Sequence, residues 1–496
     1  MSWSESSRLQ TENSDERKTT MRTLVQVLSQ AERDQVHERS LEMLQTIGVR
    51  VDTLRGRRLL AEAGAVVDET NHIVRLPRTL VEHSLRCAPR KFSLGGRRPG
   101  WSLPLNEGCC TLSADGSAVY IYDSASGERL PGTYDHWLKA TRLIDTLDEV
   151  GVYWKMVESV EMTHSANLFI RYWRDLLNNY SKHIQESTSS IEESRWLLEI
   201  LQVVFGDREI LRKLHPLSFI ICPFSPLVIE ETFTDAYLEI AGWDIPVVIM
   251  PMPLMGMTSP ASLLSTLLLG NCEVLAMNCL VQAASPGTPV IYAPALAVME
   301  PRTGRYSGGA VEHALLGAVV TEMASYYNLP CEACAGGSDH HIPGIQASYE
   351  RAINWTLPAL SSPDILVGPG LLSGSTMLSF EQLILDVEVF KRCQRLSRGI
   401  ECEPDKWLEE VLSKAGPGGS FLSQRSTREA LKAGEWQISK LGVYSSFEKW
   451  VSNGRAELLG DARQEIEKLL AAHQPIPLDE TILRELAKIE RRAGEY

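Results

Sequence analysis

The chain is short of positive charge: among its 496 residues, 49 Lys and Arg stand against 63 Asp and Glu, for a formal net charge of -14. Nucleic-acid binding depends on clustered Lys and Arg, so this balance argues against a nucleic-acid partner. The N-terminal run MSWSESSRLQTENSDERKTT lacks the apolar core of a signal peptide. Ten scattered cysteines, mostly in apolar runs, favour buried free thiols over disulfides. We predict a cytoplasmic protein with a disordered polar tail over residues 1–30.

Several motifs for catalysis or cofactor binding are also absent. The sequence has no G-x-S-x-G elbow for a nucleophilic serine. Gly368-Pro369-Gly370 lacks the helix-opening glycine of a dinucleotide-binding loop. The run from Ser338 to His341 offers three potential metal ligands, but neighbouring loop residues cannot all point at one ion. Cys331 and Cys334 lie three apart in a predicted strand and so face opposite sides. The sequence therefore predicts neither a metal site nor a tightly bound cofactor.

One apolar stretch, residues 261–284, is long enough to suggest a membrane span. It carries four polar side chains within its length, and it begins after the helix-start signal Thr258-Ser259-Pro260. Helices that are apolar all round also occur in the cores of large proteins. We predict a buried helix here and no membrane partner.

Strands that alternate with helices are the main feature of the central region. Seven runs are predicted as strands: VGVYWKM, KHIQE, LSFIIC, IPVVIM, PVIYAP, PCEACAG and DILVG. Helical segments between them require parallel strands, and one further strand would complete a closed barrel. We predict an α/β fold: a TIM-type (β/α)8 barrel over residues 116–400, an N-terminal α+β appendage over 31–115 and a C-terminal helical region over 401–496.

Ligands bind at the C-terminal ends of the strands in such barrels. Aromatic residues are frequent in these positions and Lys or Arg are few, which suits a cationic ligand because ring faces attract positive charge. Tyr153, Tyr292 and Tyr306 are candidates to enclose the cation, followed by Trp154 and Phe224. The alternative is that these tyrosines are core or rim residues.

Several motifs follow one another in order along the chain, among them PMPLMGMTSP from Pro251, PGTPVIY from Pro286, Arg302-Thr303-Gly304, Gly336-Gly337-Ser338-Asp339 and Tyr349-Glu350. In these motifs, over roughly residues 36–400, the chain resembles the trimethylamine methyltransferase superfamily, the corrinoid-protein-dependent methyltransferases of methylamine and betaine metabolism. The resemblance implies a barrel whose mouth receives the corrinoid (cobalamin) of a separate carrier protein.

Two departures from the family pattern bear on the substrate. The best-known members carry pyrrolysine, whereas the strand PCEACAG contains only ordinary residues. A tertiary amine needs its nitrogen activated to lose a methyl group, but a quaternary ammonium already leaves as a neutral amine. In addition, His341 and Gly344 stand where the family usually has a lysine and a further acid. We therefore predict methyl transfer from a quaternary amine, such as glycine betaine, to the Co(I) corrinoid.

For that reaction we assign roles to five further residues. His340, His341 and Gln346 are candidates to hold a substrate carboxylate, and Asp339 could orient one of the histidines. Glu312 could balance the cation or stabilise the first turn of its helix. Two alternatives stay open: a non-catalytic barrel that binds methylated amines, and a barrel lyase with His341 as its base. We also expect a homo-oligomer.

Overall fold

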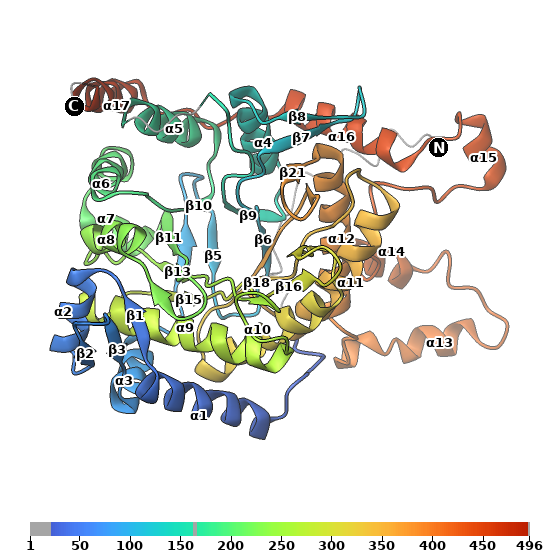
Figure 1. The fold of residues 1–496 in the computed structure, drawn as a ribbon. Helices are drawn as coiled ribbons and strands as arrows, with labels where there is room; N and C mark the ends of the chain where they lie inside the picture. Colours follow the sequence, from blue (N-terminus) through green and yellow to red (C-terminus); the bar gives the residue numbers. More distant parts are fainter. Residues whose placement is uncertain (1–20, 162–165, 495–496) are drawn as a thin grey trace.

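Eight parallel strands form the central sheet of the computed structural model, which describes residues 21–161 and 166–494. Following the chain, they are β6 (Thr111–Ser113), β9 (Val150–Tyr153), β10 (His183–Glu186), β11 (Leu217–Ile221), β13 (Val247–Ile249), β15 (Val290–Tyr292), β18 (Glu332–Cys334) and β19 (Ile365–Val367). Neighbours in the sheet follow one another along the chain, and a bridge between Tyr292 and Cys331 links β15 to β18. The strands thus nearly close into a barrel (Figure 1), which confirms the predicted fold class.

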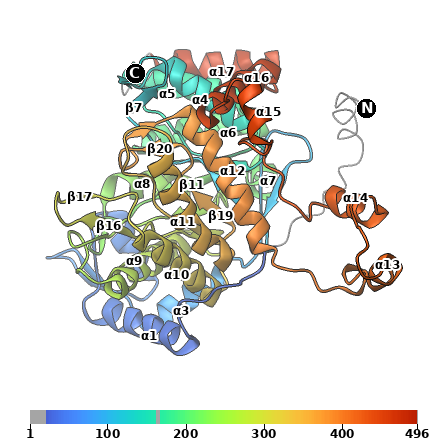
Figure 2. The same cartoon turned by 90° about the vertical axis from the view of Figure 1, so that its right-hand side faces the viewer.

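Helices join successive strands and cover the outside of the barrel (Figures 1 and 2). They are α4 (Tyr134–Thr146), α5 (Ala166–Asn179), α6 (Ile191–Phe205), α7 (Arg208–Leu214), α8 (Glu231–Ile240), α9 (Leu263–Ala284), α10 (Glu312–Tyr327), α11 (Ile345–Ser361) and α12 (Phe380–Ser397). The eighth strand, absent from the seven predicted ones, is β6. It precedes residue 116, where we expected the barrel to begin.

The alternation of side chains along the strands separates an inner core from an outer one. Val152, Ile220, Val248, Ile291 and Ile365 pack together inside the barrel. The hairpin of β4 (Ser93–Gly95) and β5 (Ser102–Pro104) adds two leucines to this inner core. The hairpin is bonded to the start of β11, because the Gly95 N–H donates to the His215 carbonyl at 3.1 Å. It therefore closes the N-terminal end of the barrel, and the C-terminal end is where a cavity can form.

The apolar segment of residues 261–284 folds as α9, between the barrel and the N-terminal helices α1 (Gln30–Thr46), α2 (Leu54–Glu62) and α3 (Arg78–Cys87). Among the described residues, α9 is the one helix long and apolar enough to cross a membrane, and 83% of its most apolar window is buried. Its polar residues are bonded inside the protein: Glu273 accepts hydrogen bonds from the Ser225 hydroxyl and the Leu227 N–H, both at 2.8 Å. The predicted buried helix is confirmed.

The N-terminal appendage contains a small sheet with the strand order β12-β1-β3-β2. The predicted hairpin joins β2 (Val66–Asp68) to β3 (Ile73–Arg75), while β1 (Val49–Val51) pairs with β12 (Val228–Ile229), a strand from the loop after β11. Of the predicted tail, residues 1–20 lie outside the described part. Residues 21–29 pack on the barrel, where the Met21 N–H donates to the Gly108 carbonyl at 2.7 Å.

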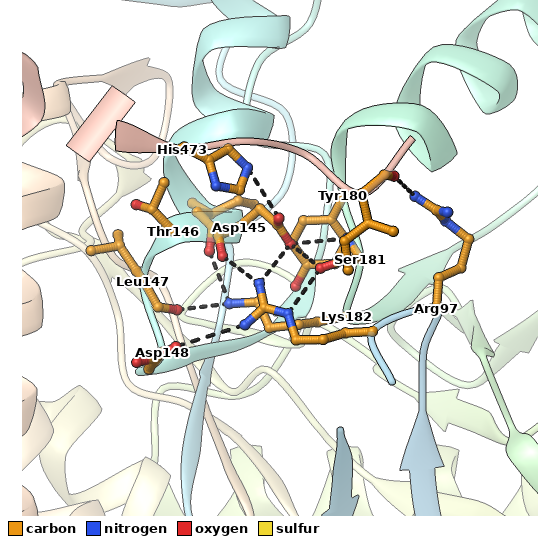
Figure 3. A network of polar contacts seen from close by, with 12 residues as sticks. Arg97, Asp145, Thr146, Leu147, Asp148, Tyr180, Ser181, Lys182 and His473 are labelled. Carbon is orange, nitrogen blue, oxygen red and sulfur yellow. Dashed lines mark hydrogen bonds and ion pairs between the residues drawn. The ribbon is translucent and has the colours of Figure 1, made fainter. Parts of the chain in front are cut away.

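The C-terminal region returns to the barrel through two helices. α16 (Leu458–Ala472) packs on α4 and α12, and α17 (Glu480–Ala493) packs on α5 and α6. Between them, His473 Nε2 lies 3.1 Å from an Asp145 carboxylate oxygen, beside the buried Lys182 (Figure 3). The Lys182 ammonium donates to the Leu147 carbonyl at 2.7 Å, and burial lowers its pKa to about 7. A buried polar contact thus fixes the C-terminal region at the N-terminal end of the barrel strands.

Candidate active site

A cavity of about 340 Å³ lies at the C-terminal end of the barrel. Its walls come from the ends of six of the eight strands or from the loops that follow them, and they contain no Lys or Arg. These wall residues include Asp115 after β6, Trp154 after β9, Met250 after β13, Ala295 after β15, Cys334 in β18 and Val367 in β19. Met252, also in the wall, is 53% exposed, so the cavity opens to solvent.

Two aromatic rings from different loops form part of the wall. Trp154 directly follows β9 and lies against Gly116, where an added Cβ would come 2.8 Å from a carbon of the indole. Glycine at this position therefore leaves room for the ring. Tyr306 ends the hairpin of β16 (Ala297–Glu300) and β17 (Arg305–Tyr306) and meets His313 edge-on, with ring centroids 5.7 Å apart. Of the three tyrosines predicted to enclose a cation, Tyr306 is the one that lines this cavity.

A buried carboxyl group shares the inner face of β18 with Cys334. Glu332 lies two residues before Cys334, and strand alternation directs both side chains into the barrel. The Gln185 amide of β10 donates to Glu332 Oε1 at 3.0 Å. Within the described part of the chain, Glu332 Oε2 has no hydrogen-bond partner, although the residue is fully buried. Burial raises the pKa of Glu332 to about 8. A buried polar atom without a partner is uncommon in proteins and marks this group as a candidate ligand.

Among the described residues, Asp115 is the one carboxyl residue that lines the cavity, whereas Glu332 lies deeper in the barrel and does not line it. An Asp115 oxygen accepts a hydrogen bond from the Gly116 N–H at 2.8 Å. Burial raises the pKa of Asp115, and the guanidinium of Arg351 opposes that shift. The cavity therefore combines aromatic rings, apolar side chains and one carboxyl group, which together suit a small organic cation.

This chain matches the model of one protein family, Trimethylamine methyltransferase (MTTB), over residues 4–496. The chain belongs to the trimethylamine methyltransferase family. It is 29% identical to trimethylamine methyltransferase MttB of Desulfitobacterium hafniense (strain DSM 10664 / DCB-2), over 93% of this chain and 92% of that protein. It is 26% identical to the glycine betaine methyltransferase of Desulfitobacterium hafniense (strain Y51), over 95% and 97% of the two chains. The predicted family and the predicted enzyme class, a methyltransferase, are confirmed.

Among solved structures, the chain is similar to the monomethylamine methyltransferase MtmB of Methanosarcina barkeri. The TM-score is 0.48 at 12% sequence identity, and the alignment covers 88% of this chain and 92% of that one.

Tyr153 and Tyr292, the other two tyrosines predicted to enclose the cation, face outward from the barrel. The Tyr153 hydroxyl accepts a hydrogen bond from the Trp137 indole of α4 at 2.9 Å. The Tyr292 hydroxyl donates to the Asn271 side chain of α9 at 2.8 Å. Both rings are fully buried between strands and helices. They belong to the outer core, so we do not propose them as substrate ligands.

The five predicted polar residues do not line the cavity: three lie in the loop after β18, Glu312 begins α10 and Gln346 lies in the first turn of α11. Asp339 accepts hydrogen bonds from the Ser307 hydroxyl at 2.6 Å and the Gly308 N–H at 2.8 Å. Gln346 donates to Glu350 at 2.8 Å. Asp339 therefore links the loop after β18 to the residues that follow β17, whereas the Gln346 bond lies within α11.

His340, His341 and Glu312 complete this group. His340 Nδ1 lies 2.8 Å from the Ile342 carbonyl, and His341 is exposed with its Nδ1 2.7 Å from the Ser373 hydroxyl. Glu312 occupies the first turn of α10, where a carboxylate interacts favourably with the helix dipole. None of the three is placed to touch a ligand in the cavity, including His341 in its alternative role as a lyase base.

A buried ion pair holds the loops above β18 and β19. Arg351 Nε of α11 lies 3.2 Å from a carboxylate oxygen of Asp386 in α12, and both side chains are almost completely buried. The same oxygen of Asp386 accepts a hydrogen bond from the Gly370 N–H at 2.8 Å. Arg351 also donates to the carbonyl of Gly336, a residue of the cavity wall. The pair thus fixes one side of the cavity.

Proposed function

We propose that this chain moves a methyl group from a small quaternary amine, of the glycine betaine class, to the Co(I) corrinoid of a separate carrier protein. The observation that carries the proposal is the composition of the cavity. Trp154, Tyr306 and Asp115 line it and, in the described part of the chain, no Lys or Arg does. The buried Glu332 lies two residues before the lining residue Cys334 on β18. A quaternary ammonium cannot donate hydrogen bonds, so ring faces and carboxylates are the groups that bind it.

The cavity can also hold the carboxylate of a betaine. Ser117 and Ser375 line the wall and each offers a hydroxyl donor. We propose these serines for the role that the sequence predicted for His340, His341 and Gln346. One of the relatives is a glycine betaine methyltransferase, which agrees with this substrate class.

The reduced cobalt of the carrier supplies the nucleophile, so this chain has to bind the substrate, orient an N-methyl group toward the opening and exclude water. The exposed Met252 marks the side from which the carrier can approach. As the C–N bond breaks, the positive charge on nitrogen disappears. Groups that hold the cation therefore stabilise the bound substrate more than the transition state, and they lower KM without raising kcat.

The decisive experiment measures methyl transfer directly. The purified chain is incubated with a corrinoid carrier in the Co(I) state, and the absorbance of the corrinoid is followed after addition of glycine betaine, other quaternary amines or trimethylamine. We expect turnover with at least one quaternary amine and none with trimethylamine. Binding of quaternary amines without any turnover would favour the non-catalytic barrel, and loss of the substrate without change at cobalt would favour a lyase.

Changing Trp154 to leucine is expected to raise the KM for the quaternary amine by about 30-fold, with a much smaller change in kcat. A desolvated contact between a cation and an aromatic ring contributes about 2 kcal/mol, and 1.4 kcal/mol corresponds to a factor of ten. Steady-state kinetics at saturating carrier measure both constants. The matched control is Trp196→Leu, which removes a half-buried indole from α6 outside the cavity. Equal KM values for the two variants would exclude Trp154 from cation binding.

A further inference from the structure

One histidine in the wall of the cavity has a ring nitrogen without a partner. His313 is the second residue of α10 and is 2% exposed. It lines the cavity beside Tyr306, whose ring it meets edge-on. Within the described part of the chain, its Nδ1 atom forms no hydrogen bond. A buried polar atom in this state is uncommon in proteins, and a ligand that supplies the missing bond is one cause. The methyl transfer proposed above does not use this side chain.

The other ring nitrogen determines what Nδ1 can bind. His313 Nε2 lies 2.8 Å from the Ser307 carbonyl, which can only accept a hydrogen bond, so Nε2 carries a proton. Burial lowers the pKa of His313 below its ordinary value of 6.5, although the Ser307 carbonyl and nearby carboxylates oppose that shift. The ring is therefore neutral at neutral pH. Its Nδ1 then presents a lone pair that accepts a hydrogen bond.

The protein covers the rest of the ring. A Cβ added to Gly336 would come 2.9 Å from Cγ and 3.0 Å from Cδ2 of His313, so the backbone packs closely against this part of the ring. Ser307 occupies Nε2. The Leu296 carbonyl also lies near the ring, but it forms no hydrogen bond with Nδ1. Because His313 and Leu296 both line the cavity, a ligand there can supply the missing donor.

A quaternary amine can supply this donor in one way. Its nitrogen has no N–H, and the carboxylate of glycine betaine only accepts hydrogen bonds. Water can bind Nδ1 in the free protein, but a ligand that displaces it without replacing the bond loses affinity. A hydroxyl group on the substrate can donate to Nδ1 while the ammonium stays beside the rings of Tyr306 and Trp154.

We propose that His313 selects quaternary amines that carry a hydroxyl group, by accepting a hydrogen bond from that hydroxyl through Nδ1. The inference rests on the proposed function, because it takes the cavity as the site of a quaternary amine. It adds a second recognised group of the substrate and the side chain that binds it. No proton is transferred and no covalent bond changes at His313, so it is a specificity-determining residue.

The test compares the binding of matched ligands by isothermal titration calorimetry, which requires neither the carrier nor turnover. Trimethylserine differs from trimethylalanine by one hydroxyl group, and choline has a hydroxyl where propyltrimethylammonium has a methyl group. For at least one pair, the wild-type chain should bind the hydroxylated member about tenfold more tightly or better. The reason is that the other member leaves the buried Nδ1 without a donor.

Two substitutions of His313 separate the acceptor from the rest of the side chain. His313→Gln keeps an N–H group near the position of Nε2, where it can donate to Ser307, but it has no acceptor at the position of Nδ1. It should reduce the preference within a pair to about threefold or less. His313→Asn places an amide oxygen near the position of Nδ1 and should keep the preference. Each ratio compares two ligands in one variant, so general damage to the cavity cancels.

The outcomes distinguish this inference from the proposed function. Equal affinities within both pairs in the wild-type chain would overturn the role of His313 and leave the proposed function intact, and this comparison is decisive even if a variant fails to fold. A preference that persists in His313→Gln would overturn it too, as would loss of the preference in both variants. Binding of no quaternary amine at all would overturn the proposed function and this inference together.

Discussion

Changing Glu332 to glutamine is expected to raise the KM for the quaternary amine by about 30- to 100-fold, while kcat stays within about threefold of the wild-type value. A hydrogen bond or close contact to a charged group contributes about 2–3 kcal/mol when it is buried, which corresponds to this factor. In the proposed reaction the loss falls on KM, because nitrogen is charged in the bound quaternary amine and becomes neutral as the methyl group leaves. Steady-state kinetics with varied amine at fixed carrier give the two constants separately.

The pH dependence provides a second readout of the same variant. In the free enzyme, burial raises the pKa of Glu332 to about 8, so the carboxylate that attracts a cation forms as the pH rises through that value. The kcat/KM of the wild-type chain should increase with pH up to about 8 and then level off, since this constant reports ionisations of the free enzyme. Glu332→Gln should lack this rise. An unchanged profile in the variant would remove Glu332 from substrate binding.

The stability of the folded wild-type chain should fall as the pH rises, whereas its kcat/KM should increase. The folded-state pKa of about 8 lies above the ordinary value of 4.5, so the folded chain keeps a proton that the unfolded chain has released. The stability from this protonation is complete below pH 4.5 and is lost as the pH rises to 8. Glutamine does not titrate, so thermal unfolding should show Glu332→Gln with the higher Tm at pH 9 and a similar Tm at pH 5.

Glu273 offers a matched control for both measurements. It is also a buried carboxyl group, and burial raises its pKa to about 7. It lies on α9 in the outer core and accepts hydrogen bonds from Ser225 and Leu227. Glu273→Gln should therefore leave KM unchanged. A rise in KM equal to that of Glu332→Gln would mean that the loss of any buried carboxyl group perturbs the site indirectly.

The barrel could be predicted because its strands are apolar runs separated by long helices, and that order permits a parallel sheet. β6 escaped prediction for a physical reason. It has three residues, Thr111 to Ser113, and two of them carry hydroxyl groups. Its place in the sheet depends on pairing with β9 and β19, which are distant in sequence. A local pattern does not contain that information.

The neighbours Tyr153 and Trp154 show why the sequence could not rank its candidate residues. Every residue from Val150 to Tyr153 is buried, because a strand of a parallel barrel is covered on both faces. No polar alternation then indicates which residues point inward. A shift of one residue exchanges the two faces, so the sequence ranked Tyr153 ahead of Trp154, whereas Trp154 is the one of the two that lines the cavity.

The sequence did contain a signal that Glu332 has a special role. It is the one charged residue in the predicted strand PCEACAG, and a charge in a strand that must be buried needs an explanation. Asp339 and His341 were more conspicuous because they stand together with His340 in one run. Their partners, Ser307 and Ser373, lie more than thirty residues away, so the bonds that hold them in the rim could be found only from the structure.

Changing Arg351 to methionine is expected to lower the free energy of unfolding by about 3–5 kcal/mol, because it leaves the buried Asp386 carboxylate without its counter-charge. The exposed side-chain fractions of the two residues are 1% and 0%, so water cannot replace the lost partner. Urea unfolding followed by tryptophan fluorescence measures the change. The control is Arg484→Met, which breaks an exposed pair with Glu480 on α17 and should cost less than about 0.5 kcal/mol.

A double-mutant cycle separates the ion pair from the packing of the arginine side chain. Asp386→Asn removes the charge but keeps one oxygen to accept from the Gly370 N–H or the Gln382 amide. The double variant Arg351→Met/Asp386→Asn should be more stable than the sum of the single changes predicts, by about 2 kcal/mol or more, since no charge is left buried and unpaired. Additive losses would show that Arg351 acts through its contacts with Trp355 and the Gly336 carbonyl, independently of Asp386. In either case the loop after β18 loses its support, so kcat/KM should fall together with stability in Arg351→Met and recover in part in the double variant.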